Sequence, residues 1–179
     1  MGANLSLGAV SRAEARRATS SVIFKGYHGK NLVCEQQKID MVLSGHKGSV
    51  SCVRWGGTCL IYTASEDKTI KVWNDNDGTL VHTLTSHAHW VNHLALSTDF
   101  VLRTAYHDHT GQIPDTEEAK IARARERYLK AATVQGEVVE RLVSASDDFT
   151  MYLWELSKGT KPIARLMGHQ KQVNHVTFS

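Results

Sequence analysis

The stretch "YTASEDKTIKVWN", residues 62–74, decides the fold because the chain repeats it as "RLVSASDDFTMYLWE", residues 141–155. In both copies an aspartate stands four residues after a hydroxyl residue and six residues before a tryptophan. The clustered hydroxyls and carboxylates would suit an active site if they occurred once. A catalytic constellation has no reason to occur twice in one chain, whereas a structural unit does, so the stretch predicts a structural repeat.

Three histidines, each preceded by glycine or serine, mark the start of successive units: His46, His87 and His169. The second interval between them is twice the first. Each histidine is followed by a run in which apolar residues alternate with polar ones, namely "VSCVRW", "WVNHLAL" and "QVNHVTF". Short strands at regular spacing, separated by turn residues, predict an all-β repeat architecture.

This pattern resembles the WD-repeat β-propeller family, whose blades contain four strands in about 40–45 residues. In that family a histidine, a serine or threonine, an aspartate and a tryptophan form a buried hydrogen-bonded tetrad. A buried indole N–H needs an acceptor, which the hydroxyl supplies, and the aspartate fixes the tautomer of the imidazole that binds the hydroxyl. The resemblance implies one structural tetrad of His46, Thr63, Asp67 and Trp73, and a second of His87, Ser144, Asp148 and Trp154.

We therefore predict an all-β fold of WD-repeat β-propeller blades, an incomplete propeller with one helical insertion. Residues 39–179 are expected to form the partial propeller, with blades over 45–85, 86–167 and a truncated 168–179. Residues 1–38 carry no repeat signature and are expected to be an unassigned or disordered arm. The first residues, "MGANLS", fit a myristoylation pattern, but that pattern is short and common by chance.

The second unit is longer than the first, and residues 107–139 account for the surplus. Their segment "PDTEEAKIARARERYLKAA", residues 114–132, has the composition of a helix, and Asp115 with Glu118 resembles a capping box. The surplus is thus interpreted as an insertion between the first two strands of the second blade, with a helix within about residues 115–132.

The predicted helix separates an apolar stripe from a basic one. At helical spacing Ile121, Ala124 and Tyr128 share a face, which we expect to point toward the propeller. The basic stripe is a candidate contact for a partner or RNA, because cations on one face meet phosphates well. The alternative is that it is only the solvated side of a docked helix. Its members are Lys120, Arg123, Arg127 and Lys130.

Composition restricts the other function classes. The formal net charge of +3 permits weak attraction to nucleic acid without demonstrating it. The three cysteines lack C-x-x-C spacing, and the histidines around "HDH", residues 107–109, have no fixed third ligand, so we predict no metal and no cofactor. No run of 18 apolar residues occurs, so no membrane partner is predicted.

Four stretches between residues 41 and 179 resemble the Notchless proteins more closely than WD repeats in general. They are "LSGHKGSVSCVRWGGTCLIYTASEDKTIKVWN", "HAHWVNHLALSTDFVLRT", "RLVSASDDFTMYLW" and "MGHQKQVNHVTFS". The most specific of them is "HWVNHLALSTDFVLRT" followed by a charged helical insertion, since ordinary WD repeats lack this combination. The resemblance spans about three-quarters of the chain.

Notchless proteins act in the assembly of the large ribosomal subunit. The resemblance implies a non-enzymatic scaffold of the nucleus and nucleolus that binds pre-ribosomal particle proteins, with rRNA as a further candidate. In this family a ubiquitin-like domain binds Midasin, a dynein-related ATPase. No such domain is recognisable in residues 1–40, so we interpret the chain as a fragment without that contact.

A second hypothesis stays open on the sequence alone. WD repeats also build protein-interaction adaptors of other kinds, such as substrate receptors of ubiquitin ligases or signalling scaffolds. Co-sedimentation with pre-ribosomal particles distinguishes this hypothesis from the first. An enzyme is the least favoured class, because the candidate catalytic residues belong to the repeat.

Overall fold

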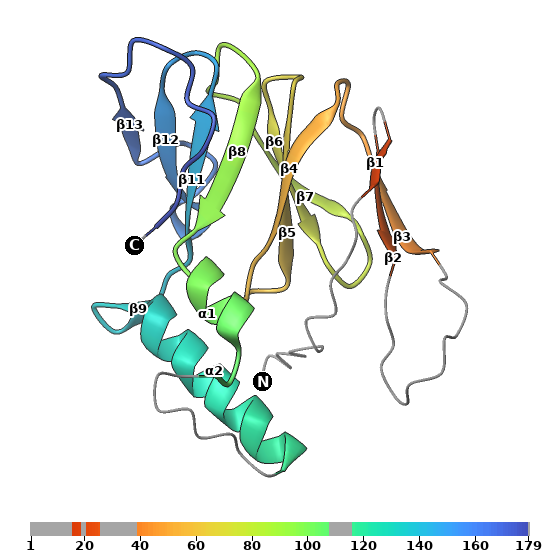
Figure 1. The fold of residues 1–179 in the computed structure, drawn as a ribbon, viewed down its shortest axis with the longest axis vertical. Helices are drawn as coiled ribbons and strands as arrows, with labels where there is room; N and C mark the ends of the chain where they lie inside the picture. Colours follow the sequence, from red (N-terminus) through yellow and green to blue (C-terminus); the bar gives the residue numbers. More distant parts are fainter. Residues whose placement is uncertain (1–15, 19–20, 26–38, 108–115, 179) are drawn as a thin grey trace.

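The computed structural model describes residues 16–18, 21–25, 39–107 and 116–178, which form three antiparallel sheets side by side, with two helices and a small two-stranded sheet at one end (Figure 1). One sheet has the strand order β4-β5-β6-β7 and the next has the order β13-β12-β11-β8. Each of these two sheets therefore has the four antiparallel strands of a propeller blade. The all-β, partial propeller predicted from the sequence is confirmed.

The blades consist of short strands joined by turns. The first blade contains β4 (Val50–Trp55), β5 (Leu60–Ser65), β6 (Ile70–Asn74) and β7 (Leu80–Leu84). The second contains β8 (Val91–Leu96), β11 (Arg141–Ser146), β12 (Met151–Glu155) and β13 (Ala164–Leu166), with a 3-10 turn, η1 (Leu156–Lys158), before its last strand. The first blade lies between residues 45 and 85, and the second between 86 and 167.

The two blades share one hydrophobic core. In β4 the buried positions Val50 and Cys52 alternate with a less buried neighbour, as expected for a strand with one face in the core. The core combines first-blade residues such as Tyr62 and Val72 with second-blade residues such as Trp154. Burial of this apolar surface fixes the two sheets face to face, because neither sheet covers its inner face alone.

A third sheet precedes the first blade. It contains β1 (Arg16–Ala18), β2 (Ser21–Lys25) and β3 (Ile39–Ser44), paired antiparallel in that order. The expected arm over residues 1–38 is therefore wrong for the two stretches that form β1 and β2. The physical reason is the apolar run Val22-Ile23-Phe24, which pairs with β3 although it carries no repeat signature.

The helical insertion lies between β8 and β11, which are neighbours in the second blade. It contains α1 (Asp99–Thr104), α2 (Glu117–Ala132) and a hairpin of β9 (Thr133–Val134) and β10 (Glu137–Val138). The predicted start at residue 107 is wrong, because α1 already begins at Asp99. Its apolar residues Val101 and Leu102 pack against α2, a long-range contact that a short apolar run cannot reveal.

The longer helix, α2, begins within the predicted range but at a different cap. Thr116 is its N-cap residue, and the Thr116 side chain accepts a hydrogen bond from the Ala119 N–H at 3.3 Å. The predicted cap, Asp115, lies outside the described residues. None of the helices in the described part of the chain is long and apolar enough to span a membrane.

A glycine pair in the first blade receives the insertion. Gly56 and Gly57 form the turn between β4 and β5, and a Cβ on Gly57 would lie 2.1 Å from the ring of Tyr128 on α2. On Gly56 a Cβ would lie 2.3 Å from the carboxylate of Glu140. Only glycine lets the blade and the insertion approach this closely. The insertion of the second blade is thus docked on the first blade.

We predict that Gly57→Ala destabilises the protein by about 1–3 kcal/mol, because the added methyl group overpacks the space that the Tyr128 ring occupies. Denaturant unfolding of the complete protein measures this cost. In a Tyr128→Ala background the same substitution should cost almost nothing, because the clash is gone. An equal cost in both backgrounds would show that the glycine pair does not seat the helix.

Candidate functional site

The structure brings the four members of the first predicted tetrad together. The His46 Nδ1 atom lies 2.8 Å from the Asp67 Oδ2 atom, and its Nε2 atom lies 2.7 Å from the Thr63 hydroxyl. The indole N–H of Trp73 donates to the same hydroxyl at 2.8 Å. His46, Thr63 and Trp73 are all buried. With Nδ1–H donating to the carboxylate, Nε2 accepts the hydroxyl proton, so each group in the relay has a partner.

Further hydrogen bonds hold the Asp67 carboxylate in place. Its Oδ2 atom also accepts the Lys47 backbone N–H at 2.9 Å, and its Oδ1 atom accepts the Thr69 N–H and hydroxyl at 3.0 and 2.6 Å. The Asp67 N–H in turn donates to the Ser65 hydroxyl at 3.1 Å. The carboxylate therefore connects the loop before β4 with the turn between β5 and β6.

These contacts set the charge states of the pair. Burial lowers the pKa of His46 below its usual 6.5 and outweighs the opposite effect of Asp67, so the imidazole is neutral near neutral pH. Burial alone would raise the pKa of Asp67, but the hydrogen bonds from Thr69, Lys47 and His46 outweigh it and lower this pKa to about 2. The site thus holds a carboxylate beside a neutral imidazole.

The second tetrad has the same geometry one blade further on. The His87 Nδ1 atom lies 2.9 Å from Asp148 Oδ2, and its Nε2 atom lies 2.7 Å from the Ser144 hydroxyl, which accepts the Trp154 N–H at 2.9 Å. Hydrogen bonds outweigh burial here too and lower the pKa of Asp148 to about 2. Burial lowers the pKa of His87 as it does that of His46, so the two relays have the same charge states.

Both tetrads are structural in their chemistry as well as their geometry. Each hydroxyl lies between an imidazole and an indole, and all three groups are buried. Trp73 packs with Leu43 of β3 and Ile61 of β5, while Trp154 enters the core shared by the two blades. Each tryptophan thus packs toward the preceding sheet, and its tetrad fixes the sheet that carries it.

In the turns that carry the two aspartates, two pairs of hydroxyl residues bind each aspartate's backbone or carboxylate but are not among the predicted site residues. The predicted sets omit Thr69 and Thr150, which bind Oδ1 of the two aspartates, and Ser65 and Ser146, which bind the aspartate N–H groups. The sequence does contain the signal. A serine two residues before each aspartate and a threonine two residues after it occur in both copies. These residues make the tight turn that aims the carboxylate at the histidine.

The carboxylate of Glu140 joins the two blades at the end that carries the insertion. It accepts hydrogen bonds from the Gly57 N–H at 3.0 Å, the Thr58 hydroxyl at 3.3 Å and the Tyr62 hydroxyl at 3.4 Å, all in the first blade. The Thr98 hydroxyl, at the start of the insertion, donates to it as well. Glu140 thus ties both ends of the insertion to the neighbouring blade, and no sequence pattern predicted this.

Arg54 makes a second bridge between the blades, at their inner strands β4 and β8. Its guanidinium lies 2.8 Å from His93 Nε2 and 3.4 Å from the carboxylate of Asp99 at the start of α1. The His175 ring stacks on His93 with centroids 4.0 Å apart. Burial, with Arg54 and His175 nearby, lowers the pKa of His93 to about 4, so this histidine is a neutral structural partner.

The predicted apolar face of α2 is correct for two of its three members. Ala124 and Tyr128 are buried, but Ile121 is 49% exposed. The expectation that Ile121 points toward protein is therefore wrong. The physical reason is the length of α2, whose N-terminal turns, which carry Ile121, extend beyond α1 (Figure 1).

The predicted basic stripe is divided by the structure. Arg127 donates to the carbonyl groups of Ala105 and His107 and to the Thr104 hydroxyl, so its expected freedom to meet phosphates is wrong. The carbonyls at the end of α1 lack helical partners, and the guanidinium satisfies them. Lys120 lies 5.6 Å from the centre of the Tyr106 ring, Arg123 is half-buried and Lys130 is exposed.

No cluster of histidine, cysteine, aspartate or glutamate in the described ranges has the geometry to hold a metal ion. Of the histidines near "HDH", His87 belongs to its tetrad and His93 binds Arg54, while His109 lies outside the described residues. Cys52 is buried in the core, and burial raises the pKa of its thiol, so Cys52 packs as an apolar residue.

Comparison with known proteins agrees with this architecture. The family described as "WD domain, G-beta repeat" matches residues 37–74. "Ribosome assembly protein 4" of Chaetomium thermophilum is 65% identical over 143 residues, which are 79% of this chain and 28% of that protein. Its namesake from Saccharomyces cerevisiae is 54% identical over 138 residues, 76% of this chain and 27% of that protein. "Protein Notchless" of Drosophila melanogaster is 43% identical over 145 residues, 78% of this chain and 29% of that protein.

Over more than three-quarters of its length the chain is similar to WD-repeat proteins of the Notchless family. The resemblance expected from the sequence is thereby confirmed. The chain spans less than a third of the length of the curated relatives it matches. The described residues contain two four-stranded blades, each with its tetrad, and the helical insertion that distinguishes the second blade.

We predict that Asp67→Ala in the complete protein lowers the free energy of unfolding by about 1–3 kcal/mol, because it leaves buried donors without an acceptor. The lowered pKa of Asp67 means that its contribution is present above about pH 4 and disappears as the pH falls toward 2. Denaturant unfolding at several pH values should therefore show the difference from wild type shrinking on acidification.

The matched control is Asp77→Ala, because the Asp77 carboxylate binds the Thr79 N–H and hydroxyl in the same way but at the surface. We expect a smaller loss for this variant. Equal losses for the two variants would contradict a special role for the buried tetrad.

Proposed function

We propose that the chain is part of a non-enzymatic scaffold that acts in the assembly of the large ribosomal subunit. The observation that supports this most is the 65% identity to a protein named for ribosome assembly, which extends over 79% of the chain. The site chemistry agrees, because the repeated hydroxyl and carboxylate groups are bound within the tetrads. In this proposal the blades are a rigid frame, and function lies in the surfaces they carry.

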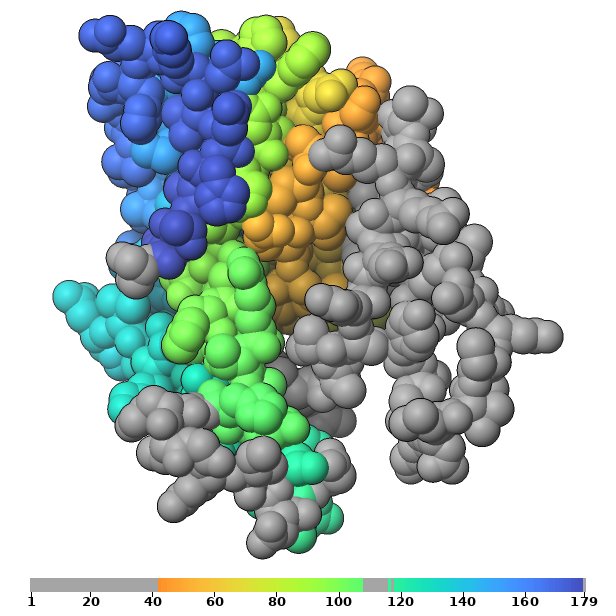
Figure 2. Space-filling model, viewed as in Figure 1, coloured from red at the N-terminus to blue at the C-terminus, as the bar shows by residue number. Residues whose placement is uncertain are grey.

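The insertion is the proposed contact with the particle. Figure 2 shows it projecting beyond one end of the blades. It carries the basic residues of α2, of which Lys120, Arg123 and Lys130 are the proposed contacts, while Arg127 holds the end of α1. Docking by Tyr128 and Glu140 holds this helix in a fixed direction, so its cations are presented as one pre-arranged surface.

The proposed partners and location follow from the same family. We place the protein in the nucleus and nucleolus, where it would bind pre-ribosomal particle proteins and rRNA. A Midasin-type ATPase would bind a ubiquitin-like domain rather than these blades. In this proposal the described blades bind the particle, and the ATPase would act through a different domain.

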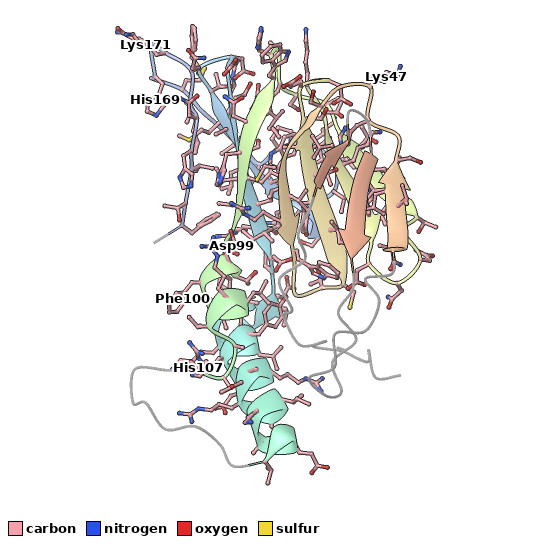
Figure 3. The ribbon with its side chains drawn as sticks, turned by 45° about the vertical axis from the view of Figure 1, so that its right-hand side comes forward. Lys47, Asp99, Phe100, His107, His169 and Lys171 are labelled. Atoms are coloured by element: carbon pink, nitrogen blue, oxygen red, sulfur yellow. The ribbon has the colours of Figure 1, made fainter. Side chains whose placement is uncertain are left out.

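The test reverses charge on the insertion of the complete protein and follows its sedimentation with large-subunit precursors. Changing Lys120, Arg123 and Lys130 to glutamate should move the protein to the free fractions as salt is raised, because each lost phosphate contact weakens binding. Arg127 is kept, because it holds α1. Changing Lys47 and Lys171, at the opposite end of the blades (Figure 3), together with Lys68, which follows the Asp67 that binds the Lys47 N–H, makes the same charge change and should have little effect.

Two results would contradict the proposal in different ways. If wild type does not travel with large-subunit precursors, the role in ribosome assembly is wrong and an adaptor of another kind is favoured. If the wild type does travel with them and the insertion variant still does so at raised salt, the scaffold role stands. The α2 cations are then only a solvated face.

A further inference from the structure

The contact between the insertion and the first blade leaves buried polar atoms without partners. Among the side chains that the structure describes, three buried polar atoms have no hydrogen-bond partner: Arg54 Nε, Asp75 Oδ1 and the Tyr128 hydroxyl. Two of them, Arg54 Nε and the Tyr128 hydroxyl, lie where the insertion meets the first blade. Buried polar atoms are paired almost everywhere in folded proteins, so two exceptions at one contact require a physical explanation.

Tyr128 makes the apolar part of this contact. Its side chain is 3% exposed, and its ring fills the space beside Gly57 that a Cβ would occupy. Burial and the nearby Glu140 carboxylate both raise the pKa of the Tyr128 hydroxyl, so the proton stays on the oxygen. This buried O–H is a donor without an acceptor. A phenylalanine ring would fill the same space without that cost, and solvent would accept the hydrogen bond if the helix left the blade.

Asp99 makes the charged part of the contact, and two arginines lie within reach of it. Arg54 Nε of the first blade lies 3.4 Å from the Asp99 Oδ2 atom without forming a hydrogen bond, and Arg103 of α1 lies 4.0 Å from the same oxygen. Figure 3 shows Asp99 at the end of α1 that faces the blades. Arg103 moves with the helix, whereas Arg54 belongs to the blade and also binds His93. Each charge therefore keeps a partner when the insertion leaves the blade.

The two helices of the insertion hold each other independently of the first blade. Val101 of α1 packs on Tyr128 and Ala132 of α2, and Arg127 of α2 binds the carbonyl groups at the end of α1. The insertion connects to the sheet only through the end of β8 and the start of β11, which are neighbouring strands. It can thus turn as one unit about these two strand ends.

We propose that the insertion is a detachable arm, in which α1 and α2 leave Gly57 together and the unsatisfied Tyr128 hydroxyl lowers the preference for the docked position. In the docked position α2 points in one fixed direction. In the released position Asp99 pairs with Arg103, and the Tyr128 hydroxyl meets solvent. A partner that binds the arm in only one position shifts the population by its difference in affinity. The movement belongs to the blades and the insertion alone, so it stands whether or not the protein binds a pre-ribosomal particle.

Hydrogen exchange of α2, measured by mass spectrometry on the complete protein, reports this movement. A released helix of 16 residues is marginal in water, so its amides exchange during each excursion, at a rate set by the released population. We expect wild-type α2 to exchange at least about tenfold faster than the blade strands β5 and β11. Tyr128→Phe should slow the exchange of α2 about fivefold or more, because it removes the unpaired hydroxyl from the docked position.

Tyr62→Phe is the matched control for the hydroxyl. Tyr62 is also buried at this contact, but its hydroxyl donates to Glu140 at 3.4 Å, so its removal should leave the exchange of α2 unchanged or make it faster. Arg103→Ala tests the alternative ion pair. It removes the cation that Asp99 keeps in the released position, so it should slow the exchange of α2 about twofold. Arg125→Ala makes the same charge change at an exposed position of α2 and should have no effect.

Three results would overturn the detachable arm. If wild-type α2 exchanges as slowly as β5 and β11, the helix opens only when the whole protein unfolds. If Tyr128→Phe folds and does not slow α2, the hydroxyl has no influence on the docked position. Should that variant fail to fold, Gly57→Ala supplies the opposite test, because overpacking the space beside Tyr128 should speed the exchange of α2 more than that of β11. An equal acceleration in both is the third contradicting result.

Discussion

The buried tryptophan N–H group is the constraint on which the two blades depend. Trp73 and Trp154 fill the space next to the preceding sheet, and a buried indole N–H without an acceptor would cost about 1–3 kcal/mol there. The hydroxyl of Thr63 or Ser144 meets that need, and a neutral histidine and a charged aspartate complete the relay. Since the histidine precedes the first strand and the aspartate follows the second, one chain of hydrogen bonds ties the loop before the first strand to the second and third strands of each blade.

The same logic explains how a blade tolerates a long insertion. The second tetrad joins His87 to Ser144 and Asp148 across the whole length of α1 and α2, with distances that match the first tetrad within 0.1 Å. The insertion leaves the sheet after β8 and returns at β11, and these strands are neighbours. What fixes its direction lies in the neighbouring blade, where Gly57 receives Tyr128 and Glu140 binds the turn.

The blades and the tetrads could be predicted from the sequence because their signal is repeated at fixed spacing. The docking of the insertion could not, because Gly57, Tyr128 and Glu140 are far apart in the chain and occur once. α1 was missed because its apolar residues also fit a strand. The surroundings of Ile121 and Arg127 were predicted wrongly, because helical spacing shows which residues share a face of a helix but not what that face packs against. Thr69 and Thr150 were missed although the repeat contains them.

The central claim is that a neutral histidine connects the aspartate, by a hydrogen bond at Nδ1, to the hydroxyl that binds the tryptophan, by a hydrogen bond at Nε2. The most direct measurement is long-range proton–nitrogen correlation by nuclear magnetic resonance, which identifies the tautomer and protonation state of each histidine. For His46 and His87 at neutral pH the structure predicts neutral rings protonated at Nδ1, since Nδ1 faces the aspartate and Nε2 faces the hydroxyl. Rings protonated at Nε2, or imidazolium ions, would contradict the relay.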